Sequence, residues 1–68
     1  MFLRKMKLNN KLVGAVLSDD VAAATALLNQ GANVNIWQGS KHIMELTQSV
    51  QMATLLLERG SYYTGHAL

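Results

Sequence analysis

The sequence contains no cysteine and no proline, and only 15% of its 68 residues are charged. Without cysteine the chain can form neither a disulfide framework nor a thiolate metal site. The only histidines, His42 and His66, fit no metal-ligand motif, so we expect both at the surface or in the tail, with no metal and no other cofactor. Hydrophobic residues make up 50% of the chain, which excludes a disordered tail or linker.

Catalytic constellations are missing as well. No serine lies in a nucleophile-elbow context, and the glycines do not have the spacing of a phosphate-binding loop. Asp19 and Asp20 are adjacent carboxylates, but they lie between two predicted helices, where helix capping is the expected role. No group of nucleophile, base and orienting residue can be assembled, so we expect a protein that is not an enzyme.

Long apolar runs are also absent. The run Leu12–Leu17 ends at Ser18, which makes it shorter than the roughly 7–15 residues of a secretory core and the ~18 residues of a membrane span. We therefore expect a soluble, cytoplasmic protein with no membrane partner. Such a short chain buries only about 60% of its unfolded surface, so its stability requires good helix packing or oligomerisation.

Positive charge is concentrated at the start of the chain. Four basic residues form this basic patch: Arg4, Lys5, Lys7 and Lys11. The patch could bind nucleic-acid phosphate, an anionic membrane or an acidic protein. The reading that we favour is a cap, in which the apolar side chains of the segment cover the first helix pair while the cations stay solvated. Those apolar residues are Phe2, Leu3, Met6 and Leu8.

Hydrophobic periodicity predicts four helices in two pairs. The first begins at Asn9 or Asn10 and continues to Leu17, the second spans about 21–30, the third runs from Ser40 or Lys41 to Thr47, and the fourth holds residues 50–57. Gly31 and Gly60 end the second and fourth helices, and Gly14 is expected to mark close packing of the first. The methionines at 6, 44 and 52 have core spacing.

Residues 32–39 lack a helical period and predict a short extended finger or hairpin-like loop between the pairs. This finger contains the only tryptophan, Trp37, which is either an interface anchor or part of the core. On either side of it, the segment L-L-N-Q-G-A at Leu27–Ala32 recurs as L-L-E-R-G-S at Leu56–Ser61, an offset of 29 residues. A fixed period of this kind indicates a helical solenoid, in which neighbouring units bury each other's apolar faces.

The run A-V-L-S-D-D-V at Ala15–Val21, followed by A-L-L-N-Q-G-A-N-V-N at Ala26–Asn35, resembles the second half of an ankyrin repeat. That family writes the stretch as A-A-x-x-G-D, a second helix ending in L-L-x-x-G-A, and then D-V-N. Here Asn33 stands for the usual Asp, and Asp19 stands for the turn Gly. The second unit matches less closely, because it lacks the Thr-Pro pair of G-x-T-P-L-H, places His42 at the Pro position and repeats after 29 residues instead of about 33.

The resemblance implies an all-α fold of two stacked helix-turn-helix pairs joined by the extended finger. Residues 1–9 would form a basic N-terminal cap segment, 10–38 and 39–61 the two ankyrin-like repeats, and 62–68 a C-terminal tail. It further implies a protein–protein interaction module whose partners bind the fingertip and the exposed side of the following helix. Carried over by position, that partner-binding surface comprises Ile36, Trp37, Gln38, Ser40 and Glu45.

Two units are fewer than the roughly three that a solenoid needs for independent stability. We therefore expect a homodimer, with Phe2, Leu3, Met6, Tyr62 and Tyr63 as self-association or capping residues. The small size and the lack of chemistry suit an inhibitor or adaptor that occupies a partner protein's surface, including one encoded by a phage or mobile element. The alternative is a small basic regulatory protein that binds nucleic acid.

Overall fold

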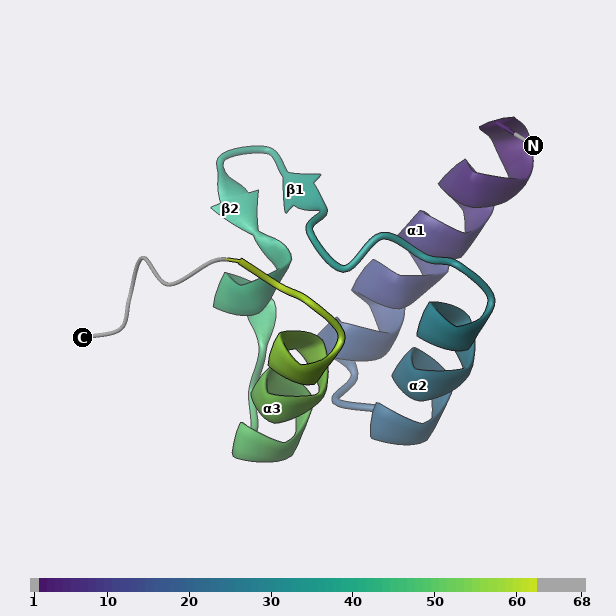
Figure 1. The fold of residues 1–68 in the computed structure, drawn as a ribbon. Coiled ribbons are helices and arrows are strands. Elements are labelled where there is room, and N and C mark those ends of the chain that lie inside the picture. The colour runs from purple at the N-terminus through teal and green to yellow at the C-terminus, as the bar shows by residue number, and fades with distance from the viewer. Residues whose placement is uncertain (1, 63–68) are drawn as a thin grey trace.

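The computed structural model describes residues 2–62, with side chains described from Arg4 onward. The elements in chain order are α1 (Phe2–Leu17), α2 (Val21–Asn29), β1 (Trp37–Gln38), β2 (Lys41–His42), the 3₁₀ helix η1 (Ile43–Leu46) and α3 (Val50–Glu58). The described chain is mostly helical, so the all-α expectation holds in outline, with one small two-stranded sheet in addition. In Figure 1, α2 and α3 occupy the lower half of the view, and the hairpin of β1 and β2 projects at the top.

Helix α1 begins at Phe2, so the predicted start at Asn9 or Asn10 is wrong. Neither proline nor glycine interrupts the first thirteen residues, and most of them are good helix formers, so the helix extends through the basic patch. Asn9 has a different role inside the helix. Its Oδ1 accepts a hydrogen bond from the backbone N–H of Asn33 at 2.8 Å, which ties the finger to α1.

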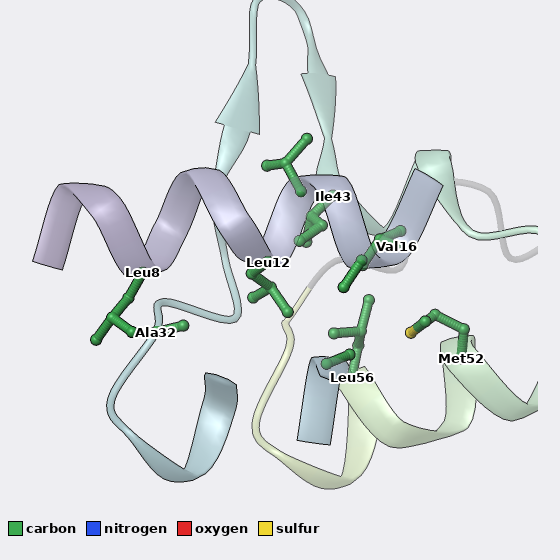
Figure 2. Close-up of a cluster of buried hydrophobic side chains, with 10 residues drawn as sticks. Leu8, Leu12, Val16, Ala32, Ile43, Met52 and Leu56 are labelled. Atoms are coloured by element: carbon green, nitrogen blue, oxygen red, sulfur yellow. The ribbon is translucent and has the colours of Figure 1, made fainter. Parts of the chain in front are cut away.

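The core forms along one side of α1, where Leu8, Leu12 and Val16 recur every fourth residue (Figure 2). The other buried apolar residues of this cluster are Val13, Ala15, Ala24, Ala32, Ile43, Met52 and Leu56. Met6, whose spacing predicts a core position, is 47% exposed, and Leu17, the last residue of the apolar run in α1, is 51% exposed. Leu17 follows Val16 by one residue, which turns its side chain about 100° away from the buried side of the helix.

Helices α2 and α3 begin with equivalent N-caps, 29 residues apart. Asp20 Oδ1 accepts a hydrogen bond from the N–H of Ala23 at 3.0 Å, and Ser49 Oγ accepts one from the N–H of Met52 at 3.1 Å. In each case a short polar side chain satisfies a donor that the helix itself leaves unpaired. The capping role predicted for Asp20 is confirmed.

The same two helices also end alike. Gly31 has a φ of 106° and Gly60 a φ of 102°, a backbone region that only glycine enters at low cost. The N–H that follows each glycine returns to the last helical turn, from Ala32 to Leu27 at 3.1 Å and from Ser61 to Leu56 at 3.0 Å. For these two helices, the 29-residue repeat of the sequence is therefore also a repeat of backbone geometry.

The third predicted helix, from Ser40 or Lys41 to Thr47, is wrong. Strand β2 occupies its first turn, and only the four residues of η1 are helical. Thr47 is extended, with φ −67° and ψ 144°, and its Oγ1 donates to the carbonyl oxygen of Met44 at 2.8 Å, which closes the helix. The chain then reaches Ser49 in an extended conformation, from which Ser49 caps α3.

Polar contacts join the turns that precede α2 and α3. Ser49 Oγ donates to Asp19 Oδ1 at 2.7 Å, and Gln48 Nε2 donates to the carbonyl oxygen of Leu17. Asp19 has a φ of 56°, the one positive φ of a non-glycine residue in the described range, and this conformation costs about 1–2 kcal/mol. The two adjacent carboxylates therefore differ in role: Asp20 caps α2, and Asp19 joins the turn before α2 to the residue that caps α3.

Gly14 lies exposed on α1, and a methyl group at this position would meet no atom within 4 Å, so the expected close packing is wrong. Gly14→Ala should raise the free energy of unfolding by up to ~1 kcal/mol, because alanine loses less backbone entropy in a helix. The matched control, Gly31→Ala, should lower it by about 1–2 kcal/mol, because φ is positive there. Urea titration followed by Trp37 fluorescence measures both; a destabilised Gly14→Ala variant contradicts the prediction.

Candidate partner-binding surface

The finger folds as a tight antiparallel hairpin. Trp37 pairs with His42, and Gln38 pairs with Lys41, around a two-residue turn. The first residue of this turn, Gly39, has a φ of 63°. Glycine at this place is typical of the type II′ turn, whose twist matches that of the flanking strands. The sequence predicts the extended segment before Gly39 but not the return strand.

Trp37 is 51% exposed, whereas His42, its neighbour across the hairpin, is fully buried. The two ring centroids lie 5.2 Å apart with an interplanar angle of 87°, an edge-to-face contact. The buried imidazole thus supports the indole from one side, while about half of the indole surface faces solvent. Trp37 combines features of both readings of the sequence, since it contacts a buried group and is still half exposed.

The imidazole of His42 joins separate segments of the chain. Its Nδ1 accepts a hydrogen bond from the N–H of Met44 at 3.1 Å, so the proton of the neutral ring is on Nε2. Nε2 donates to Asn35 Oδ1 at 3.1 Å. The backbone N–H of His42 donates to Glu45 Oε2 at 3.0 Å, which completes a capping box at the start of η1. The expectation of a surface His42 is therefore wrong.

Burial lowers the pKa of the His42 imidazole below its ordinary value of 6.5, because desolvation disfavours the cation. The Glu45 carboxylate opposes this effect by attracting the cation. Protonation would also place an N–H on Nδ1, facing the N–H of Met44. The neutral imidazole is the form that fits this site.

A row of asparagines connects α1 with the hairpin and with the residues after α3. Asn9 Oδ1 accepts from the N–H of Asn33, and Asn33 Oδ1 accepts from the N–H of Asn35, both at 2.8 Å. Asn35 Oδ1 accepts from the N–H of Tyr62 at 3.1 Å in addition to its bond with the imidazole. The Asn-Val-Asn segment that carries the ankyrin resemblance therefore fixes the base of the hairpin.

The five residues expected at the partner-binding surface fall into two groups. Trp37, Gln38 and Ser40 are exposed on the hairpin. Ile36 and Glu45 are half-buried: Ile36 packs against the core, and Glu45 caps η1. We call Trp37, Gln38 and Ser40 the hairpin tip. The open part of the candidate surface is this tip, and the two other residues support it.

The residues expected in self-association or capping lie near the two ends of the chain. Met6 is 47% exposed and Tyr62 is 64% exposed. The Tyr62 ring lies 5.6 Å from the ring of His42, so it borders the hairpin. The described residues do not include the side chains of Phe2 and Leu3, nor Tyr63 and His66.

All four residues of the basic patch are exposed on α1. Arg4, Lys7 and Lys11 follow one another at spacings of three and four residues, which places them on one side of the helix. Lys5 follows Arg4 by one residue and is turned about 100° away. The patch is therefore a stripe of three cations with a fourth beside it.

His42 is the residue whose place the sequence analysis missed. The sequence does contain a signal for its capping position, because the spacing His42-x-x-Glu45 is that of a capping box with histidine in place of serine or threonine. This pattern predicts a helix that starts at Ile43, as observed. The bond to Asn35 has no such local signal, because it depends on how the hairpin folds.

Among the described residues, no three His, Cys, Asp or Glu side chains are grouped as a metal site requires. Within the same range, no helix is long and apolar enough to cross a membrane. Comparisons with known proteins find no matching family model, no similar curated protein and no similar solved structure. The resemblance to ankyrin repeats stays a prediction that rests on the residues quoted above.

Stability should fall as the pH drops below about 6.5. The folded-state pKa of His42 is lower than its unfolded value of 6.5, so the unfolded chain takes up the proton first. The free energy of unfolding therefore decreases as the pH falls from 6.5 towards the folded-state pKa, with a slope of at most about 1.4 kcal/mol per pH unit. Urea titrations between about pH 5 and pH 8 measure this slope.

His42→Asn is the matched variant for this prediction. It keeps a side-chain acceptor at the capping position, but it does not titrate, so the pH slope should disappear. His66→Asn controls for the other histidine and should keep the slope. A slope that persists in His42→Asn contradicts the assignment to His42.

Proposed function

We propose that the chain is a small protein–protein interaction module that binds a partner protein through its hairpin tip. The observation that carries the proposal is Trp37, which is 51% exposed and contacts the buried ring of His42 edge to face. Tryptophan is enriched among the residues that dominate binding energies. Because buried contacts of His42 and Asn35 already order the hairpin, its binding requires little further ordering.

The surroundings of Trp37 are also suited to an interface. Gln38, Ser40 and Lys41 are exposed beside it on the same short hairpin. A central aromatic residue with polar and charged neighbours has the composition of a binding patch, in which the rim keeps water away from the central contact. The hairpin projects from the helices, so a partner can reach it without displacing core residues (Figure 1).

The resemblance to ankyrin repeats supports this proposal. The repeated caps of α2 and α3 agree with a solenoid of two units. Asp19, at the place of the family's turn glycine, has the positive φ that a glycine would favour. A module of this kind acts by covering a surface of its partner, so the role that we propose is that of a non-enzymatic inhibitor or adaptor.

Trp37→Ala should abolish partner binding and leave the helices intact. The readout is affinity capture from an extract of the cells that produce the protein, quantified by mass spectrometry. Loss of a central tryptophan should reduce the captured partner at least about tenfold. Leu17→Ala is the matched control, because Leu17 is also 51% exposed but lies at the end of α1, outside the hairpin tip. Circular dichroism verifies that both variants are folded.

The purified partner then gives an independent measurement. Trp37 is the only tryptophan of the chain, so its fluorescence emission should shift to shorter wavelength when a partner buries it. A partner that binds Trp37→Ala as tightly as the wild type, with no shift in the wild type, excludes the hairpin tip as the binding site.

Nucleic-acid binding is the second candidate function, and the stripe of Arg4, Lys7 and Lys11 is the observation that favours it. If these cations contact phosphates, the affinity for duplex DNA should depend steeply on salt. Three or four phosphate contacts predict a log–log slope between about −2.7 and −3.6. Lys7→Gln should reduce the slope by about 0.9. Fluorescence anisotropy with labelled DNA measures both, and the absence of binding at about 50 mM salt excludes this function.

A further inference from the structure

Helices α2 and α3 carry the same side chains along one face. At the 29-residue offset, four pairs of positions on this face hold identical residues: Val21 and Val50, Ala24 and Ala53, Thr25 and Thr54, and Leu28 and Leu57. Their spacing of i, i+3, i+4 and i+7 is that of a single helix face. The four residues of the second helix, Val50, Ala53, Thr54 and Leu57, are here named the α3 face.

In the first helix pair, the corresponding face of α2 is covered. Asn29 lies on the same side of α2 as Thr25, and its Oδ1 accepts a hydrogen bond at 2.8 Å from Nη1 of Arg59, the C-cap residue of α3. Ala24 has no exposed surface, and Val21 is half-buried against the core. This side of α2 therefore already forms one interface within the chain, and its partner is α3.

In the second pair, the equivalent surface is open. Val50 is 82% exposed and Leu57 is 48% exposed, and Thr54 between them is exposed as well. Exposed aliphatic side chains in a row mark an interaction site when they are not needed for the core. On α2, the identical residues are covered by α3, the next helix of the repeat. The α3 face therefore has the shape that receives another repeat unit.

The opposite end of the stack carries the complementary surface. Gly14 of α1, three residues of α2 and the C-cap residue Gln30 line an open groove of about 460 Å³, the α1/α2 groove, which the charged residues Lys11 and Asp20 also border. The three residues of α2 are Ala23, Ala26 and Leu27. One repeat later, the corresponding positions are Met52, Leu55, Leu56 and Arg59, the side of α3 that packs against the first pair. The groove is thus the side of a repeat unit that faces the preceding unit, here lined by smaller side chains.

Charge favours the same pairing. A hollow that shares Gln30 with the groove is lined by two cations, Arg4 and Lys5. Within the chain, Arg59 donates to Asn29, and the positions that correspond to these residues are Gln30 and Glu58. A unit docked on the α3 face in the manner of the internal interface therefore brings Gln30 and the two cations next to the carboxylate of Glu58.

We infer that the chain assembles head to tail, with the α3 face of one copy docked in the α1/α2 groove of a second copy. This contact continues the interface between α2 and α3 across two molecules. It is heterologous, so each copy keeps one open surface and the assembly can grow beyond two chains. It goes beyond the homodimer expected from the sequence, because the assembly does not stop at two chains. It does not involve the hairpin tip, so it stands independently of the proposed partner binding.

The test uses two variants of the full chain, each of which blocks one surface. Thr54→Arg places a long cation in the middle of the α3 face, and Gly14→Arg places one in the groove. Both positions are exposed on helices, where arginine is a good helix former, so folding should be retained. Gln51→Arg is the matched control, because Gln51 is exposed on α3 but lies outside the α3 face. Circular dichroism verifies the helix content of each variant.

Sedimentation velocity over a range of protein concentrations gives the readout. The wild type and Gln51→Arg should show a mass that rises with concentration past that of two chains. Each blocking variant alone should associate about 100-fold more weakly, because the long arginine side chain either separates the α3 face from the second copy or fills the groove. An equimolar mixture of the two blocking variants should form a two-chain species that grows no further, since only one intact pair of surfaces is left.

Several results would overturn the inference. A wild type that stays monomeric up to about 1 mM shows that the α3 face does not bind a copy, whether residues 63–68 or a different protein cover it. A closed dimer that Gly14→Arg leaves unchanged shows that the α3 face pairs with itself. A mixture of the blocking variants that stays monomeric shows that the two surfaces are not complementary. Trp37→Ala should assemble like the wild type, which separates this inference from the proposed function.

Discussion

The buried, neutral imidazole of His42 is the contact on which the second half of the structure depends. It accepts a hydrogen bond from the N–H of Met44 at the start of η1 and donates one to Asn35 Oδ1 at the base of the hairpin. It also contacts the ring of Trp37 edge to face. Both of its nitrogens are used, so a substitution that removes either bond leaves a buried polar group unpaired, at a cost of about 1–3 kcal/mol. The exposed part of the hairpin is therefore ordered by a group that itself never reaches the surface.

The stretch of chain one repeat earlier shows which kind of interaction the hydrogen bonds of His42 replace. One repeat before His42 stands Val13, a buried residue in the middle of the long helix α1. The stretch before α2 is thus ordered by apolar packing along about four turns of helix α1. Before α3, the equivalent stretch is strand β2 followed by the single 3₁₀ turn of η1. It buries less apolar surface and is held by hydrogen bonds to the side chain of His42.

How much of this could be predicted depends on whether the signal is local. The second helix of each pair was predictable, because Asp20 at one end and Gly31 and Gly60 at the other are local signals of helix boundaries. The return strand β2 and the burial of His42 were not, because they depend on Asn35 and on contacts across the turn. For the same reason, sequence could name Trp37 as a candidate anchor but could not decide between interface and core.

Partner binding uses the hairpin tip, and head-to-tail assembly uses the α3 face and the α1/α2 groove. Because the two do not overlap, assembly can increase the affinity for a partner. In a head-to-tail assembly each added copy contributes one more hairpin tip, so a partner with repeated sites would meet several tips at a high effective concentration and bind them more tightly than one. Assembly also acts on folding, because a copy that binds only the folded chain stabilises it by mass action. A 68-residue chain with an exposed valine and leucine on α3 buries little apolar surface by itself, so its stability would then rise with its own concentration. Partner binding and folding would be coupled through the assembly, although the hairpin tip takes no part in the contact between copies.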